Sequence, residues 1–435
     1  MSASTMPPIG RLTGQLKGYA WGSHTALAEL QGRPAPASGP EAELWFGDHP
    51  DAPSLLERPG DVRPVPLDRV VAADPVGELG PGLAAEGGRL PFLLKVLAID
   101  ASLSLQTHPD VERARAGFAA EEAAGIPRDA PERCYRDDSP KPELFHALRP
   151  SQALCGFRPV AATIALLDRL DVLPDVRDRL HRDGESALAT VVRELLSTPE
   201  DRRAALVTEL RQAAERVVQE PAGAGGGDAV GSSGAGGVRS LAADAVAQAI
   251  LGLATVYPQD PGVAVALLLD LLELPPGASV YLSPGTLHAY LRGYGVEIMA
   301  ASDNVLRGGL TPKHVDVDEL LRILDTRVGS PPAVTGVPGV VGEVVLPAAE
   351  DRFRLSRIDV PAVLDARPST GLELDRRGPQ ILLCTQGVLS ASADDVEVEV
   401  SPGSAAYVSD RAERVVLRAG GTSPVTVFRA TPGPP

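Results

Sequence analysis

The stretch LPFLLKVLAIDASLSLQTHPD, residues 90–110, decides the fold class of this chain. Its first part, Leu90–Ile99, is a continuous apolar run of strand length, which is typical of a strand buried on both faces. Its second part, Ser102–Gln106, alternates as a further strand would. Because alternate side chains of a strand point to the same face, Gln106 and His108 are expected to lie side by side. The stretch therefore predicts a β domain that presents two polar side chains on one face.

The pattern becomes helical after this β region. From about residue 160 to residue 220, and again over 241–255, apolar residues recur at spacings of three and four, which favours amphipathic helices. A further helix is predicted over Gly262–Leu272, because an Asp-Pro pair precedes it as an N-terminal signal. Residues 222–237 are rich in Gly and Ser, and they predict a flexible loop.

Strand patterns occupy both ends of the chain. The N-terminal part reads mostly as short strands and loops, and residues 343–435 alternate with turns between, a spacing that suits a β-sandwich or jelly-roll domain. The predicted fold class is mainly β with an α insertion. We expect four segments: the first part of a β domain at 1–155, a helical insertion at 156–275, the second part of the β domain at 276–330, and a C-terminal β domain at 331–435.

Composition narrows the class of protein. The 435-residue chain shows neither an apolar run of about 18 residues nor a signal-peptide pattern, so we expect a soluble cytoplasmic protein that binds no membrane. Its three cysteines form no CxxC pair, which favours a reducing compartment. The net charge of −16 counts against nucleic acid as a partner but allows a small anionic substrate in a local cationic pocket. The composition is compatible with a monomer.

Lysine is scarce, with only four lysines among the 41 basic residues. Lys95, Lys141 and Lys313 lie in three stretches that together hold four of the seven histidines, whereas Lys17 has no assigned chemistry. An ammonium group can shuttle protons and a guanidinium cannot, so these three stretches are candidates for a functional site. The alternative is that the lysines are chance survivors of a codon bias.

A mixed set of metal ligands can be assembled from the same stretches: Gln106, His108, Glu143 and His288. Glu143 follows a Pro-Lys-Pro run that stiffens the backbone, and His288 opens a predicted strand just after a Pro-Gly-Thr turn. Two imidazoles, one carboxylate and one amide would form an open zinc site of the catalytic type, although other divalent metals could compete. The alternative is that these histidines are ordinary polar residues.

A second group of polar residues follows His288 along the chain. Asp303 and Asn304 are adjacent, and Arg307 and Lys313 bring two cations within seven residues. A forked guanidinium and a compact ammonium suit contact with a phosphate or an enediolate, so this segment is a candidate anion clamp. The alternative is a solvated loop.

Several motifs together resemble the type I mannose-6-phosphate isomerase family. They are YAWG (19–22), AELWFGDHP (42–50), LPFLLKVL (90–97), SLQTHPD (104–110), KPE (141–143), ALCGF (153–157) and the run from His288 to Lys313. The resemblance covers most of the chain, and the last run is its most specific part. It implies a cupin-type catalytic β domain, an inserted helical domain and a second, cupin-like C-terminal β domain.

The resemblance also implies roles for individual residues. One zinc ion per chain would be bound by Gln106, His108, Glu143 and His288, and Arg307 would be the active-site arginine. Ser104 and Lys313 match the positions thought to hold the phosphate. The matching pocket positions are Lys95, Lys141, Tyr290, Glu297 and Asp303.

The reaction that the resemblance implies interconverts mannose 6-phosphate and fructose 6-phosphate through a cis-enediol. Lys141 is our candidate base or proton shuttle, and Glu297 or Asp303 is the alternative. One departure matters, because many members of the family read HKPE where this chain reads PKPE, and Pro140 can act neither as an acid nor as a base. Any role of that histidine must pass to another group here or be dispensable.

Two other functions remain open at this point. The chain could be a different metal-dependent cupin enzyme, such as an oxygenase or another sugar isomerase, although Arg307 and Lys313 favour a phosphorylated substrate. It could also be a sugar-phosphate-binding regulator without activity. The intact set of candidate ligands argues against a loss of catalytic activity, and Pro140 is the only departure from the motif.

Overall fold

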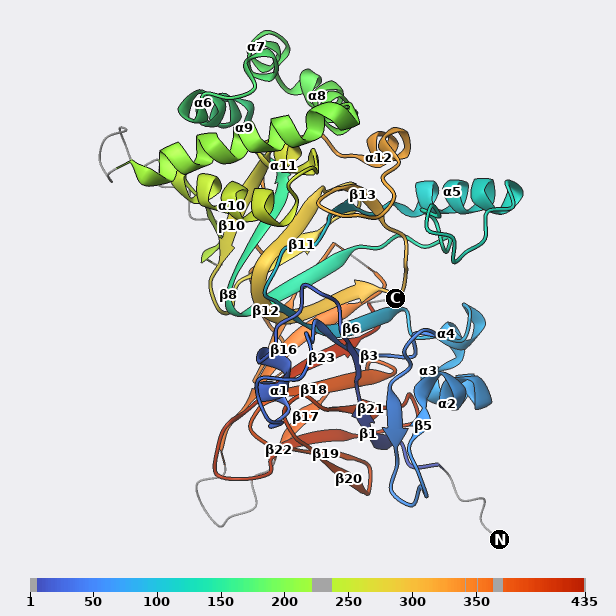
Figure 1. Ribbon diagram of the computed structural model, residues 1–435. Coiled ribbons are helices and arrows are strands. Elements are labelled where there is room, and N and C mark those ends of the chain that lie inside the picture. Colours follow the sequence, from blue (N-terminus) through green and yellow to red (C-terminus); the bar gives the residue numbers. More distant parts are fainter. Residues whose placement is uncertain (1–5, 221–236, 341, 350, 363–370, 434–435) are drawn as a thin grey trace.

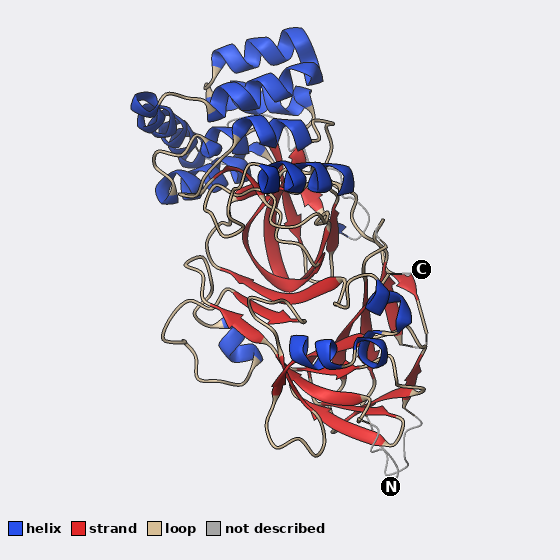
Figure 2. Cartoon of the chain, turned by 90° about the vertical axis from the view of Figure 1, so that its right-hand side faces the viewer, coloured by secondary structure: helices blue, strands red, loops and turns tan. Residues whose placement is uncertain are grey.

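The computed structural model describes residues 6–220, 237–340, 342–349, 351–362 and 371–433. Helices gather at one end of the molecule, a curved β region lies in the middle, and further β-sheets form the other end (Figures 1 and 2). The predicted fold class, mainly β with an α insertion, is confirmed. The predicted flexible loop at 222–237 lies outside the described residues except for Gly237. No described helix is both long and apolar enough to cross a membrane.

The middle region is a ten-stranded antiparallel sheet. Its main path runs β2 (Gln15–Lys17), β3 (Glu43–Phe46), β6 (Phe92–Ile99), β12 (His288–Ala300), β8 (Glu143–Phe157), β10 (Leu269–Leu274) and β9 (Arg239–Ser240). In addition, β11 (Ser279–Leu282) pairs with β8, and β7 (Leu105–Thr107) pairs with both β12 and β13 (Leu306–Gly309). All eight residues of β6 are buried, as the apolar run predicts.

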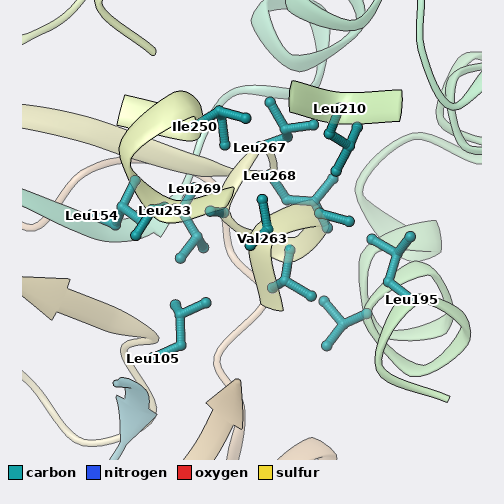
Figure 3. Close-up of a cluster of buried hydrophobic side chains, with 14 of the residues drawn as sticks. Leu105, Leu154, Leu195, Leu210, Ile250, Leu253, Val263, Leu267, Leu268 and Leu269 are labelled. Carbon is teal, nitrogen blue, oxygen red and sulfur yellow. The ribbon is translucent and has the colours of Figure 1, made fainter. Parts of the chain in front are cut away.

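The helical end covers one edge of this sheet. Its helices are α6 (Val160–Leu170), α7 (Pro174–Asp183), η1 (Gly184–Ala187), α8 (Leu188–Leu196), α9 (Glu200–Gln219), α10 (Ala243–Val256) and α11 (Gly262–Ala266), with α12 (Val317–Ile323) nearby. Figure 3 shows Leu195, Leu210 and Ile250 from the helices packed in one cluster with Leu105 and Leu154 from the strands. This shared core holds the helices against the strands that carry the candidate site.

The other end combines two sheets and four short helices. A nine-stranded sheet runs β14 (Val337–Pro338), β15 (Glu343–Leu346), β16 (Arg354–Val360), β23 (Val425–Thr431), β18 (Gln380–Gln386), β21 (Ala405–Val408), β1 (Ile9–Thr13), β4 (Leu55–Glu57) and β5 (Val65–Pro66). A four-stranded sheet runs β17 (Leu372–Leu374), β22 (Val415–Ala419), β19 (Leu389–Ala393) and β20 (Val396–Val400). The short helices are α1 (Ala26–Leu30), α2 (Leu67–Ala73), α3 (Pro75–Leu79) and α4 (Pro81–Ala85). The nine-stranded sheet therefore joins N-terminal strands to C-terminal ones.

One expectation about secondary structure was wrong. The predicted helix over Gly262–Leu272 ends at Ala266, and Leu269–Leu274 forms strand β10 instead. Periodicity alone does not distinguish a helix from a strand in an apolar run, and here the strand is favoured because it pairs with β8 and β9. The described part of residues 1–155 consists mostly of strands and loops, as expected, and also contains five helices, of which α5 (Val111–Ala123) is the longest. Asp110 caps α5 by accepting a 2.8 Å hydrogen bond from the backbone N–H of Arg113.

A buried arginine network stabilises the nine-stranded sheet. Arg429 of β23 is fully buried, and its guanidinium donates to Gln380 at 2.8 Å, Glu343 at 3.2 Å and the Asp375 carboxylate at 2.6 Å. Removal of one partner from a buried ion pair leaves uncompensated charge and costs about 3–5 kcal/mol. We expect Arg429→Ala to lower the local free energy of opening of β23 by about that amount, measured by amide hydrogen exchange. In the control Arg414→Ala, which removes an exposed pair with Glu373, the loss should be much smaller, because solvent screens an exposed pair.

Candidate active site

Three strand ends bring His108, Glu143 and His288 together. His108 immediately follows β7, Glu143 opens β8 and His288 opens β12. One ligand atom from each residue lies within 4.8 Å of the other two. The three residues are 3%, 2% and 1% exposed, so they form a buried cluster of two imidazoles and one carboxylate. His108 and His288 are 180 residues apart in the sequence, and the sheet brings them together because β7 pairs directly with β12.

Backbone carbonyls fix the orientation of both imidazole rings. The Nδ1 atom of His108 lies 2.7 Å from the carbonyl oxygen of Asn304, and Nδ1 of His288 lies 2.9 Å from that of Thr286. A carbonyl only accepts, so each Nδ1 carries the proton and each Nε2 keeps its lone pair. The two Nε2 atoms lie 3.3 Å and 3.4 Å from the carboxylate oxygens of Glu143.

The same three residues fit a divalent metal ion. Nε2 of His108, Nε2 of His288 and Oε2 of Glu143 are buried and have no hydrogen-bond partner among the described residues. Burial of unsatisfied polar atoms costs free energy, and a coordinated metal would satisfy all three at once. The carbonyl contacts behind the two rings are the support that metal-bound histidines generally have.

Burial and charge place these ligands in their metal-binding protonation states. Burial lowers the pKa of His108 to about 4, and the charge of Lys141 adds to the effect, so the imidazole is neutral. Burial alone would raise the pKa of Glu143, but the ammonium of Lys141, 2.9 Å away, and His108 hold that pKa well below its usual range. Neither group would have to lose a proton at neutral pH when a metal binds.

Gln106 and Arg307 are neighbours in the sheet beside this cluster. Gln106 of β7 lies opposite His288 of β12 on one side and opposite Arg307 of β13 on the other. The amide therefore comes from the strand next to His288, on a half-buried residue. The guanidinium of Arg307 is partly buried, and burial lowers its pKa.

A second buried charge network lies on β6 and β12. The Nζ atom of Lys95 is 3.3 Å from Glu297 and 3.9 Å from Glu43, and both acids raise the pKa of the lysine against the effect of burial. Burial raises the pKa of Glu297 to about 7, the charge of Glu143 adds to this, and Lys95 opposes it. The hydroxyl of Tyr290 is buried next to Glu297. The structure thus brings three of the predicted pocket residues together, with Glu43 as a partner that the sequence did not indicate.

Asp303 pairs with a histidine that sequence reasoning missed. Its carboxylate lies 3.2 Å from Nε2 of His49, within the motif at 42–50 to which no chemistry was assigned. Burial tends to raise the pKa of Asp303, but the hydrogen bond from His49 and the charges of His49 and Lys141 hold it below its usual range. Asp51 lies near enough for these three residues to form a second possible metal group. It fits a metal less well, because Asp51 is exposed and the Asp303 side chain is 36% exposed.

The residues expected at the phosphate are not members of the cluster. Ser104 is half-buried immediately before β7, and Lys313 is exposed in the segment after β13. Lys313 lines a cavity of about 1020 Å³ between the helical end and the β13–α12 segment, together with Arg203, Tyr257, Asp260 and Thr311. No hydrogen bond among the described residues joins Ser104 to Lys313, so their expected shared role stays a prediction.

A buried His-Glu-His cluster with a supporting shell, in an antiparallel sheet capped by helices, defines a metal-site protein of the cupin type. The family model described as phosphomannose isomerase type I, catalytic domain, matches residues 9–160. Mannose-6-phosphate isomerase of Escherichia coli (strain K12) is 33% identical over 416 residues, which covers 94% of this chain and 97% of the relative. The rat mannose-6-phosphate isomerase is 30% identical and covers 98% of both chains. This chain therefore belongs to the mannose-6-phosphate isomerase family, in its type I branch.

Solved structures agree with this assignment. The Salmonella typhimurium mannose 6-phosphate isomerase bound to fructose 6-phosphate and zinc has a TM-score of 0.83 and 30% sequence identity to this chain. The match covers 98% of this chain and all of the Salmonella chain. A second mannose 6-phosphate isomerase structure, holo with zinc bound, has the same TM-score and identity. The expected cupin-type fold with a helical insertion is thereby confirmed.

Proposed function

We propose that this protein is a zinc-dependent isomerase that interconverts D-mannose 6-phosphate and D-fructose 6-phosphate. The observation that carries the proposal is the buried cluster of His108, Glu143 and His288, whose unpartnered ligand atoms converge on one point. Its support is that relatives across nearly the whole chain are mannose-6-phosphate isomerases and that a related structure holds fructose 6-phosphate and zinc.

One zinc ion would be held by four side chains: Gln106, His108, Glu143 and His288. With neutral imidazoles, a neutral amide and one carboxylate, the site would keep a net charge of about +1, so it would remain electrophilic. When bound, zinc supplies a Lewis acid that polarises the sugar oxygens at the reacting carbons.

The chain's own residues would carry the proton transfers. After the sugar ring opens, a base removes the proton from C2, and the resulting cis-enediol is protonated at C1 to give the ketose. We propose Glu297 as this base, because a pKa of about 7 would let it both accept and return a proton at neutral pH. Lys141 then serves as the proton shuttle, held 2.9 Å from Glu143, and Arg307 stabilises the anionic intermediate.

Ring opening needs an acid–base group near the sugar, and we propose that His49 with Asp303 supplies it. Pro140 is buried at the position where many family members carry a histidine, so the chain needs another source of this proton. In the His49–Asp303 pair the Asp303 side chain is 36% exposed, and the charge of Lys141 helps to lower its pKa. The Asp303 carboxylate accepts from Nε2–H of His49, and Nδ1 of His49 accepts from the backbone N–H of Asp51 at 3.3 Å, so the tautomer of the ring is fixed and the group left to meet the sugar is the Asp303 carboxylate.

The acidity of Glu297 gives a pH prediction. Because the carboxylate must be ionised to accept a proton, we expect log(kcat/KM) to rise with pH up to about 7, with a slope of about tenfold per pH unit below that. Lys95 opposes the raised pKa of Glu297, so Lys95→Gln should move this limb to higher pH by about one unit.

The control for this prediction is Arg63→Gln, which removes an exposed charge in the loop between β4 and β5 and should leave the limb in place. A limb that keeps its position in Lys95→Gln would show that Glu297 is not the group that titrates.

A coupled assay tests the proposed function itself. Mannose 6-phosphate and unphosphorylated mannose are offered to the zinc-loaded protein, and formation of the corresponding ketose is followed. We expect turnover of the phosphate ester and a much lower kcat/KM for free mannose, since remote phosphate binding orients the reacting carbons. Equal use of both sugars would favour a different sugar isomerase, and absence of turnover with zinc present would favour a binding protein.

A further inference from the structure

Three cations near the candidate site have no carboxylate partner among the described side chains, and they affect one another electrostatically. Most arginines of this chain have an acidic partner, as in the pairs Arg58–Glu78 and Arg133–Glu121. Among the described residues, the side chains of Arg136, Arg307 and Lys313 form neither an ion pair nor a hydrogen bond with another side chain. This group, which we call the cationic trio, is therefore available to a ligand.

The trio is placed by a hydrogen-bonded link to the metal cluster. The backbone N–H of Arg136 donates to Oδ1 of Asn304 at 2.7 Å, and Nδ2 of Asn304 donates to the carbonyl of Ser139 at 2.8 Å. The carbonyl of the same Asn304 accepts from His108 at 2.7 Å. Arg307 follows three residues later on β13. One buried asparagine thus fixes the position of Arg136 relative to the metal ligands.

The three positive charges act on one another. Burial, followed by the charges of Arg307 and Arg136, lowers the pKa of Lys313. Burial and then the charge of Arg136 lower the pKa of Arg307. The charge of Arg136 also helps to lower the pKa of Asp303, but the Asp303 carboxylate is already hydrogen-bonded to His49. Cations gathered without a neutralising acid destabilise the free protein, and a bound dianion would relieve the repulsion.

We propose that Arg136 is a phosphate-binding residue that completes, with Lys313 and beside Arg307, the subsite for the 6-phosphate group and thereby sets the preference for a phosphorylated sugar. The inference rests on the proposed function for the identity of the sugar, but the anion site itself stands on the trio. Arg136 is exposed at the rim, where a forked guanidinium can close over phosphate oxygens. Sequence reasoning missed it because a single exposed arginine between Tyr135 and Asp137 has no distinguishing pattern.

The test compares Arg136→Gln with Arg136→Lys and with Arg115→Gln, an exposed arginine of α5 that serves as the matched control. In Arg136→Gln we expect the KM for mannose 6-phosphate to rise about 10- to 100-fold, the range for loss of a hydrogen bond to a charged group. Its kcat should change less than about twofold, because uniform binding is lost rather than transition-state stabilisation. Free mannose should be turned over with unchanged kcat/KM, Arg136→Lys should recover most of the loss, and Arg115→Gln should match the wild type.

A second measurement separates this inference from the proposed function. Inorganic phosphate is titrated calorimetrically into the zinc-loaded wild type and into Arg136→Gln. Weaker phosphate binding by the variant supports the inference even if mannose 6-phosphate is not turned over, in which case only the proposed reaction fails. Equal phosphate affinity in the two proteins, or an unchanged KM in a protein that does turn over mannose 6-phosphate, overturns the assignment of Arg136.

Discussion

Replacement of Glu143 by glutamine is expected to abolish both metal binding and isomerase activity. Glu143 is the only anionic member of the buried cluster, and an amide cannot balance the charge of a divalent ion there. The substitution also leaves the Lys141 ammonium without the carboxylate that lies 2.9 Å away, so two positive charges would face each other in a buried site. Loss of a Lewis acid worth several kcal/mol predicts a fall in kcat of about 1,000-fold or more.

The readouts are zinc per chain, measured by elemental analysis after gel filtration, and turnover of mannose 6-phosphate. The matched control is His146→Gln, a buried residue of the same strand β8 whose Nδ1 faces Ser279 at 2.7 Å, outside the cluster. We expect wild-type zinc content in the control and almost none in Glu143→Gln. A Glu143→Gln protein that keeps one zinc ion per chain would contradict the assignment of this ligand.

Arg307→Ala is expected to lower kcat by about 100- to 1,000-fold, the usual cost of removing one group that stabilises a developing oxyanion. Arg307 lies opposite Gln106 in the pairing of β13 with β7, so its guanidinium is carried by the strand next to the metal ligands. Its charge has no carboxylate partner among the described side chains, and it remains available to the intermediate. The predicted loss should appear mainly in kcat, with zinc content unchanged.

The control for Arg307→Ala is Arg292→Ala, an exposed arginine of the long strand β12. Its kcat should stay within about twofold of the wild type, as expected for a surface substitution away from the site. A kcat for Arg307→Ala that also stays in this range would remove Arg307 from the chemistry and leave it as a binding residue only.

Much of the fold could be predicted because burial in this chain follows simple periodicities. The apolar run at 90–99 became β6, with all of its eight residues buried, and the predicted start of a strand at His288 is confirmed. The helix predicted over Gly262–Leu272 was wrong in its second half, since a nearly continuous apolar run suits a buried strand and a buried helix equally. The inclusion of β1, β4 and β5 in a sheet with C-terminal strands depends on long-range pairing that no local pattern encodes.

The candidate site was also predictable only in part. Residues with metal-binding chemistry, such as His108 and Glu143, could be selected by type and spacing, and the fold brings them together. Residues whose role depends only on their three-dimensional position could not be selected from the sequence. They include Glu43 beside Lys95, His49 beside Asp303, and Arg136 in the cationic trio.

The four lysines illustrate the same distinction. Lys95 and Lys141 are buried in ion pairs with Glu297 and Glu143, whereas Lys17 lies 4.5 Å from the ring centre of Trp45, outside these pairs. Lys313 is exposed and belongs to the cationic trio. The scarcity of lysine therefore drew attention to Lys95 and Lys141, which are buried, but only the structure identifies their carboxylate partners.

The most direct test of the central claim is metal removal and restoration in a coupled mannose 6-phosphate isomerase assay. The protein is stripped with a chelator, assayed, reloaded with one equivalent of zinc per chain and assayed again. The account predicts that turnover disappears on stripping and returns with the first equivalent of zinc, and that Glu143→Gln is not rescued. Full turnover in the stripped protein, or no turnover after zinc is restored, would contradict it.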